Sequence, residues 1–300
     1  MKILIATPQS IWEIGTRKNQ EDAIFPPIGK ATSDDQVFIL CDGMGGHERG
    51  EVASNLVCDV LSSYIRDHWD EKGFTDTQLL EALNATMDDL DMLNDDSDRR
   101  PGTTLVLLVF HAGGAFAAHI GDSRIYHIRP ARHAILYKSR DHSQAYDMLA
   151  SGEITLTELK KYSKKNIITR AMLPGLERRP KPSVAHIADV RPGDYFYICS
   201  DGMLEQMSDS ELVRLFRKNI PNEQKRNKLI ELTKHNKDNH SAYLIQVTDV
   251  LHETGERLKD DEKDSPSNAL NLERPKTKVP QRKPSGVLGS FISFIKKLCK

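Results

Sequence analysis

The stretch VFILCDGMGGH, residues 37–47, is the part of the sequence that decides the fold. Four apolar residues, most of them typical of β-strands, run into Asp42, and Gly43, Gly45 and Gly46 follow before a helical pattern begins. This pattern predicts a buried strand that ends in a carboxylate, beside a turn whose main chain can approach a ligand closely. A carboxylate presented in this way suits a cation.

A second stretch repeats the arrangement. Residues 195–202 read YFYICSDG, which predicts another buried strand that ends in an Asp-Gly pair, here at Asp201. A lone Asp-Gly pair is more often only a turn. Two pairs with matching flanks favour a shared metal site at Asp42 and Asp201, because hard divalent cations prefer carboxylate and carbonyl oxygens held on rigid elements.

The composition is typical of a soluble globular protein with one large domain or two small ones. Of the 300 residues, 38% are apolar and 28% are charged. The net charge of -1, from 42 basic and 43 acidic residues, gives no support to nucleic acid as a main partner. The cysteines form no Cys-x-x-Cys pair, and the amino-terminal apolar run is too short for a signal peptide. We therefore expect a cytoplasmic protein, with Cys41 and Cys199 as buried packing residues.

Helical and strand patterns are spread over residues 1–250. Helices are predicted over residues 50–69, 76–93, 209–218 and 223–234, with Thr75 or Asp76 and then Ser208 as N-caps. Strands are predicted over residues 2–6, 103–110, 115–120, 125–129, 133–138, 183–188 and 194–200, and just after Asp238. The strands within residues 103–138 predict an antiparallel meander, with Asp122 in a tight turn close to Arg124.

An insertion over residues 141–175 separates two of the predicted strands. It has helical patterns at residues 144–150 and 157–164. Insertions of this kind form a flap over a site or cover an exposed sheet edge, and both interpretations are open.

Residues 15–23, GTRKNQEDA, place Arg17 a few residues ahead of Glu21 and Asp22. A guanidinium group offers a planar fork to a phosphate, and the two carboxylates can contact a metal directly or through its water. As a lone charge cluster, the segment would more often be a solvated loop.

Eight short motifs occur in a fixed order over residues 17–239. They are residues 17–22, DGMGGH at 42–47 with Gly50-Glu51, GTT at 102–104, GDSR at 121–124, DHS at 141–143, ITRA at 168–171, SDG at 200–202 and DN at 238–239. Each motif is weak alone. Together, over residues 11–247, they resemble the metal-dependent protein phosphatases, the PPM or type 2C serine/threonine phosphatases, in their bacterial form.

The resemblance implies an α+β fold, a four-layer α-β-β-α sandwich of two antiparallel sheets flanked by helices, over residues 1–250. It also implies a centre of two Mn²⁺ or Mg²⁺ ions. Its ligands would be Asp42 as the bridge, the carbonyl of Gly43, Asp201 and Asp238. Asp22 would bind a metal directly or through coordinated water. Glu21 and Asn239 would bind metal-coordinated water or hydrogen-bond to the ligands. Asp122 would bind a third, weaker ion towards the flap, and Arg17 would bind the substrate phosphate.

The implied activity is hydrolysis of phosphoserine and phosphothreonine in proteins, against protein kinases in bacterial signalling. Two metal ions lower the pKa of a bridging water, and the hydroxide attacks phosphorus in line without a covalent phosphoenzyme. The expected partners are phosphoproteins, among them kinases or their substrates, and the expected state is a monomer. Met44 stands where several eukaryotic members carry a histidine general acid, and His47 is interpreted as structural more readily than as catalytic.

Two other functional classes stay open. The first is a pseudophosphatase that binds phosphoproteins without turnover; the presence of every candidate ligand favours the enzyme over it. The second is a two-metal nuclease, which the lack of a basic face disfavours.

The carboxyl-terminal part has a different composition. Residues 251–285 are charged and rich in proline, which predicts a disordered linker, and residues 286–300 form a short basic amphipathic tail. Residues 271–300 carry eight basic residues against Glu273, a net charge of +7. The tail is too short to span a bilayer. It fits a peripheral membrane contact, a docking peptide for a partner, a contact with its own domain, or plain disorder.

Overall fold

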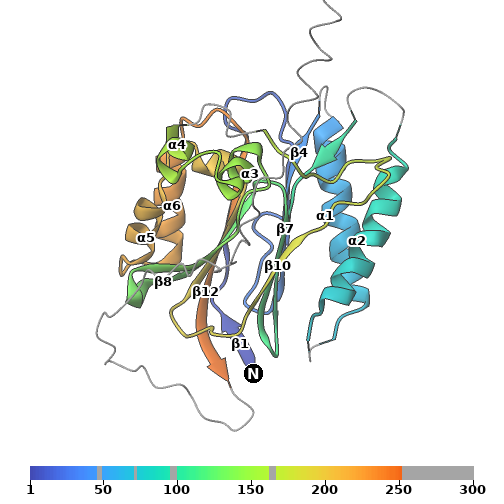
Figure 1. Cartoon of the computed structure of the whole chain (residues 1–300). Helices are drawn as coiled ribbons and strands as arrows, with labels where there is room; N and C mark the ends of the chain where they lie inside the picture. Colours follow the sequence, from blue (N-terminus) through green and yellow to red (C-terminus); the bar gives the residue numbers. More distant parts are fainter. Residues whose placement is uncertain (46–48, 71–72, 95–99, 162–166, 252–300) are drawn as a thin grey trace, which may run out of the picture. The chain divides into compact units, whose positions relative to one another are not determined.

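Residues 1–45, 49–70, 73–94, 100–161 and 167–251 are described by the computed structural model of the chain. Within these ranges the chain forms two antiparallel sheets with helices on their outer faces (Figure 1). The interpretation of His47 and the predictions for the linker and tail beyond Leu251 concern residues outside these ranges. None of the described helices is long and apolar enough to cross a membrane.

Over the described part of the chain, each sheet contains six strands. The first has the order β1-β12-β11-β8-β9, with β2 also paired to β12, and contains β1 (Lys2–Ile5), β2 (Gln9–Glu13), β8 (Arg124–Arg129), β9 (Ala134–Lys138), β11 (Tyr195–Cys199) and β12 (His240–Leu251). The second has the order β10-β7-β6-β4-β3, with β5 paired to β4, and contains β3 (Asp22–Phe25), β4 (Val37–Met44), β5 (Gly102–Thr103), β6 (Leu105–His111), β7 (Gly114–Ile120) and β10 (Ser183–Ile187).

Successive apolar side chains of a strand point to opposite faces of its sheet. Each sheet therefore packs against the other sheet on one face and against helices on the other face. In β4, Phe38 and Leu40 lie in the hydrophobic cluster between the two sheets, whereas Ile39 and Cys41 lie in a cluster with helix residues on the opposite face. The residues of β11 alternate in the same way between the inter-sheet cluster and a third cluster, which contains residues from the helices on the other side.

The helices form the two outer layers. In Figure 1, α1 (Arg49–Asp67) and α2 (Asp76–Asp91) lie along the second sheet, and α5 (Asp209–Phe216) and α6 (Asn222–Thr233) lie along the first. The insertion between β9 and β10 carries α3 (Gln144–Ser151) and α4 (Leu156–Lys161), and two 3-10 turns follow β8 and β11, η1 (Pro130–Arg132) and η2 (Asp201–Leu204). The expected four-layer α-β-β-α sandwich is confirmed.

Two of the predicted helix starts are closed by capping boxes. The side chain of Thr75 accepts a hydrogen bond from the backbone N–H of Gln78, and the Gln78 side chain accepts one from the N–H of Thr75. Ser208 and Glu211 form the same reciprocal pair at the start of α5. Both predicted caps are confirmed, because a cap depends only on residues within one turn of the helix.

The predicted meander over residues 103–138 is wrong. Strands β6 and β7 pair as expected, but β8 lies in the other sheet between β11 and β9, and β10 takes the place beside β7. The turn at Gly121, where φ is +105°, carries the chain from one sheet to the other. The sequence pattern also does not predict β2 and β3, which are short and contain or follow polar residues.

This topology brings several strand ends together. Asp42 lies near the end of β4, and Asp201 follows the end of β11. In antiparallel pairs, the start of one strand lies beside the end of its partner, so β3 places Asp22 opposite Asp42, and the start of β12 lies beside the end of β11. The two sheets therefore present their acidic residues at a common end.

Candidate metal centre

Five aspartates gather at this end of the two sheets. Asp22 and Asp42 are cross-strand partners, and Asp201 lies close enough to Asp42 for its charge to act on it. Burial, and then the negative charges of Asp22, Asp201, Asp122 and Asp238, hold the pKa of Asp42 well above its usual range. The structure therefore brings together the carboxylates that the sequence predicts as ligands.

The neighbouring carboxyl groups are perturbed in the same direction. Burial raises the pKa of Asp22 to about 7, that of Asp122 to about 8 and that of Asp201 to about 6, and adjacent carboxylates add to each shift. Buried like charges repel one another, and a bound cation removes this repulsion. A divalent metal ion would offset the negative charge that gathers here.

Two carboxylate oxygens in the cluster are buried without a hydrogen-bond partner among the described residues. Asp22 is only 2% exposed; its Oδ2 accepts a hydrogen bond of 2.8 Å from Ser200 Oγ, but its Oδ1 has none. The Oδ1 of Asp122 is in the same situation. Buried polar atoms are rarely left unpaired, so these oxygens fit ligand positions.

The arrangement is not a closed set of protein ligands. In the described ranges, no three His, Cys, Asp or Glu side chains are already disposed to hold a metal ion. Mg²⁺ and similar hard ions keep several waters and accept backbone carbonyls, so they do not require three convergent side chains. The donor chemistry of the cluster, all oxygen and partly unpaired, fits such ions.

The end of β4 is fixed by threonines that precede β6. The backbone N–H of Asp42 donates to Thr104 Oγ1 at 3.0 Å, and the Asp42 carbonyl accepts from the Thr104 N–H at 2.9 Å and from Thr103 Oγ1 at 3.0 Å. Thr104 Oγ1 also lies 2.8 Å from Ser123 Oγ, next to Asp122. The GTT motif thus holds Asp42 and links it to the Asp122 turn.

Glycines are required at two positions because other backbone segments pass very close. A Cβ atom on Gly43 would lie 2.4 Å from the carbonyl oxygen of Gly50 and 2.5 Å from that of Glu21. A Cβ on Gly202 would lie 2.0 Å from the carbonyl oxygen of Asn239. Any larger residue would push these segments apart and widen the carboxylate cluster.

Arg17 lies at the rim of the cluster. Its Nη2 donates to Asp238 Oδ2 at 2.7 Å, and its side chain is 55% exposed. The hydrogen bond to Asp238 raises the pKa of the guanidinium, which keeps its charge at any relevant pH. One end of the fork is held by the protein, and the exposed remainder is available to an anion.

Asn239 and Glu21 belong to the support of the site. Asn239 Oδ1 accepts from the Glu21 N–H at 2.8 Å, and Asn239 Nδ2 donates to the carbonyls of Ile14 and Asn19 at 2.9 and 3.0 Å. The amide therefore fastens the segment that carries Arg17 to the start of β12. Burial raises the pKa of Glu21, which lies near the same charges.

The insertion over residues 141–175 is anchored at the Asp122 turn. Asp141 makes two hydrogen bonds of 2.7 Å to Arg124. His142 Nδ1 accepts from the N–H of Gly121 at 3.0 Å, and the His142 carbonyl accepts from the Thr169 N–H at 2.9 Å. Burial lowers the pKa of His142 to about 3, so the ring is neutral. The described part of the insertion therefore borders the carboxylate cluster, as a flap would.

Sequence reasoning assigns no role to several residues that shape the site. Thr103, Thr104 and Ser200 contact the aspartates directly, and Glu205 accepts hydrogen bonds from the backbone N–H groups of Lys237 and Asp238. The signal for the first three was present, since they lie in the GTT and SDG motifs. Glu205 carries no such signal, because its partners are 32 and 33 residues away.

Comparison with known proteins supports the motif reading. Residues 14–237 match the protein phosphatase 2C family. Protein phosphatase PhpP of Streptococcus pneumoniae is 30% identical over 237 residues, which are 78% of this chain and 92% of PhpP.

Solved structures agree with the fold. The crystal structure of the Mycobacterium tuberculosis serine/threonine phosphatase PstP/Ppp is similar with a TM-score of 0.68 and 28% identity, over 82% of this chain and 100% of that one. The catalytic domain of PstP in complex with two manganese ions has a TM-score of 0.65 and 28% identity, with the same coverage. The family match extends over most of the chain, and the described fold is a PPM fold. The chain therefore belongs to the protein phosphatase 2C (PPM) family of serine/threonine phosphatases, in its bacterial form.

Proposed function

We propose that this chain is a metal-dependent phosphatase that removes phosphate from phosphoserine and phosphothreonine in proteins, and that it opposes protein kinases in bacterial signalling. The observation that carries the proposal is the cluster around Asp42, in which burial and then the neighbouring carboxylates hold the pKa of Asp42 well above its usual range, beside the exposed guanidinium of Arg17. A cluster of buried negative charge next to an anion-binding cation is what a metal-assisted phosphate site requires.

Mn²⁺ or Mg²⁺ fits the oxygen donors of the cluster. Two ions would be held by Asp42, Asp201, Asp238 and the carbonyl of Gly43, with Asp22 beside them, and Asp122 would hold a third, weaker ion. When bound, the ions would activate water as the nucleophile and offset the negative charge on the transferred phosphoryl group.

The residues of the chain then orient the substrate. Arg17 would bind two phosphate oxygens with the exposed part of its guanidinium, while its contact with Asp238 fixes the direction of approach. Asn239 would keep Arg17 in register with the aspartates through the Ile14 and Asn19 carbonyls. Met44, half-buried at the end of β4, has no proton to give, so the leaving alkoxide would take its proton from water or another side chain.

Hydrolysis of a phosphothreonine peptide by the purified chain tests the proposal. We expect turnover with Mn²⁺ or Mg²⁺, none with chelator, and a collapse of turnover in Asp42→Asn and Asp201→Asn. Nothing observed favours the pseudophosphatase alternative. It would replace the proposal if the wild-type chain bound Mn²⁺ and was nevertheless as inert as the two variants.

The proposal includes phosphoproteins as substrates, with kinases or their targets among them, and a monomeric enzyme. Light scattering on the purified chain checks the monomer. Phosphoproteomic comparison of cells with and without the chain identifies the substrates, and an unchanged phosphoserine and phosphothreonine pattern would contradict this part of the proposal.

A further inference from the structure

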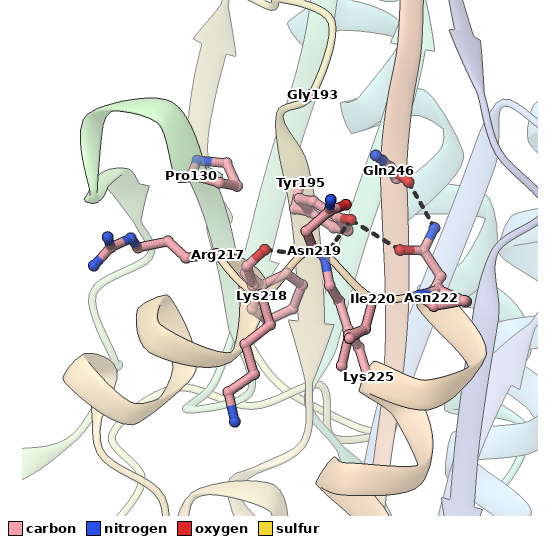
Figure 2. Close-up of a pocket in the computed structure, with 12 residues that line it drawn as sticks. Pro130, Gly193, Tyr195, Arg217, Lys218, Asn219, Ile220, Asn222, Lys225 and Gln246 are labelled. Atoms are coloured by element: carbon pink, nitrogen blue, oxygen red, sulfur yellow. Dashed lines mark hydrogen bonds between the residues drawn. The ribbon is translucent and has the colours of Figure 1, made fainter.

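A cavity of about 500 Å³ opens at the other end of the first sheet (Figure 2). Tyr195, the first residue of β11, lines it, together with the loop between α5 and α6. Asp201 is six residues further along the chain, and a strand advances by about 3.3 Å per residue, so the cavity lies roughly 20 Å from the carboxylate cluster. It is not part of the candidate metal centre.

A buried lysine forms one side of this cavity. Lys225, on α6, is 4% exposed. Its Nζ donates to the hydroxyl of Tyr195 at 2.7 Å and to the carbonyl of Phe216 at 2.9 Å, and it lies 4.4 Å from the centre of the Tyr195 ring. An ammonium group has three N–H donors, so one remains beyond these two bonds.

The charge of Lys225 has no carboxylate partner among the described residues that line the cavity, because none of them is acidic. Burial alone lowers the pKa of Lys225 to about 8. Phe216 is the last residue of α5, so the hydrogen bond from Lys225 Nζ to its carbonyl caps the carboxyl-terminal end of that helix. A neutral donor would cap the helix without the desolvation penalty of a buried charge, so the cap alone does not explain a lysine here.

The surroundings of Lys225 suit an organic ligand rather than a bare ion. Apolar wall is supplied by Tyr195, Phe216 and Ile220. The Tyr195 hydroxyl donates to Asn222 Oδ1 at 2.8 Å, and this bond fixes the polar side of the cavity, as the dashed lines in Figure 2 show. A volume of about 500 Å³ is within the range of small-molecule sites.

Two further cations surround the opening. Arg217 and Lys218 line the cavity and are exposed, and Figure 2 shows their charged ends extending away from Lys225. In this arrangement the two side chains would not contact a bound anion, but their positive charge would attract an anion to the opening of the cavity.

We propose that this cavity binds an organic anion, with a phosphate or carboxylate head group on Lys225 and an apolar or aromatic body against Tyr195, Phe216 and Ile220. The ligand satisfies the remaining N–H of the ammonium and supplies the negative charge that the cavity walls lack. This site is independent of the phosphatase activity proposed above.

The test is a titration of the full-length, Mg²⁺-loaded chain, followed through the backbone amide NMR signals of Gly193, Asn219 and Asn222. Phenylphosphonate, whose P–C bond the enzyme does not hydrolyse, and benzoate are the two anionic probes, and benzyl alcohol is the neutral control. We expect these signals to shift in a saturable way with one or both anions and not with benzyl alcohol. The anion that binds more tightly identifies the head group.

Four variants assign the binding to the cavity. Lys225→Met removes the charge at similar length, and we expect it to weaken binding by about tenfold or more. Asn219→Trp fills the mouth without removing a described hydrogen bond, and it should have the same effect even if Lys225→Met is poorly folded. Lys228→Met, an exposed lysine on α6 outside the cavity, is the matched control and should bind normally. Asp42→Asn should retain these shifts, because it alters only the carboxylate cluster.

Three results would overturn the proposal. The first is that these signals do not shift with either anion. The second is that benzyl alcohol binds as well as the anions do. The third is that binding survives in Asn219→Trp and Lys225→Met but disappears in Asp42→Asn, which would place the probe at the metal centre.

Discussion

Strand β11 has an aspartate beyond each of its ends, the buried Asp194 and the half-buried Asp201, and their surroundings shift their pKa values in opposite directions. Asp194, before the strand, is 1% exposed and accepts hydrogen bonds from Arg129 Nε and Nη2 and from His127 Nε2, each of 2.8 Å. Burial alone would raise the pKa of Asp194, but the bonds from Arg129 and His127 bring it below its ordinary value. Burial raises the pKa of Asp201, at the other end, to about 6, and nearby carboxylates add to the shift.

The difference separates a charge that the protein itself compensates from one that the proposed metal site would compensate. Asp194 has its counter-charges within the protein, so folding alone compensates the cost of burying its carboxylate. Asp201 lies among other carboxylates, and under the proposed function a bound cation would compensate its charge. A carboxylate that the fold leaves uncompensated is therefore a better guide to a binding site than burial alone.

The largest expected effect on stability comes from removing the buried carboxylate of Asp194, which compensates the charge of Arg129. Asp194→Asn leaves the charge of Arg129 buried without its main partner, and we expect a loss of about 3–5 kcal/mol in the free energy of unfolding. Urea denaturation followed by circular dichroism measures it.

Asp189→Asn is the matched control for this substitution. Asp189 also pairs with Arg129, at 2.8 Å, but its side chain is 58% exposed, so its removal should change the unfolding free energy by about 1 kcal/mol or less. Equal losses in the two variants would contradict the distinction between compensated and exposed charges.

At the other end of the sheet, neutralising a charge should damage function and not stability. We expect Asp42→Asn to reduce phosphatase turnover by about a hundredfold or more, because it removes a proposed metal ligand and a group at the reacting centre. In chelator the same variant should unfold at a higher temperature than wild type, since one of several repelling charges is gone.

The exposed pair of Asp67 and Arg66 offers a control for Asp42→Asn. Asp67→Asn removes a carboxylate of the same kind at the end of α1, with a side chain that is 66% exposed, and it should alter neither turnover nor the melting temperature in chelator. A lower melting temperature for Asp42→Asn in chelator would show that the aspartate is structural, like Asp194.

The buried lysine beside β11 gives a prediction with a defined pH window. The folded-state pKa of Lys225 is about 8, below the unfolded value of about 10.5, so the unfolded chain binds the proton more tightly. The free-energy penalty of burying the charged ammonium group is present below pH 8 and is lost as the pH rises towards 10.5. We expect the unfolding free energy of wild type, relative to Lys225→Met, to rise by about 3 kcal/mol over this range.

Urea unfolding of both proteins between pH 7 and pH 10.5 provides the measurement. Lys228→Met, on the exposed side of α6, should show no such slope relative to wild type. If the difference in unfolding free energy between wild type and Lys225→Met does not change with pH, the ammonium group already has a counter-charge. The buried charges of both Asp194 and Lys225, at this end of β11, would then be compensated within the protein.

The smallest expected effect concerns the support of Asp42. Thr104→Val keeps the shape of the side chain but removes the acceptor for the Asp42 N–H, which costs about 1–3 kcal/mol where the group is buried. Thr104→Ser keeps the hydroxyl and should lose less. If the two variants unfold at the same urea concentration, the hydrogen bond is not what fixes the end of β4.

The site was predictable from sequence where local pattern and chemistry coincide. An apolar run followed by Asp-Gly identifies both Asp42 and Asp201, and the family motifs point to Asp22, Asp122 and Asp238. The structure places all five at one end of the sheets. The cap at Thr75 is predictable for a related reason, since its partner is three residues away.

The sequence by itself determined which strands end in a carboxylate and which residues cap the helices, because these features depend on neighbours a few residues apart. Only the tertiary structure decided that β7 and β8 enter different sheets, that Asp194 is paired and that Asp201 is not. Asp194 meets Arg129 across 65 residues, and Asp201 meets Asp42 across an even longer stretch of chain. Whether a buried charge is compensated depends on such distant segments, and no local pattern of residue types records which of them will meet.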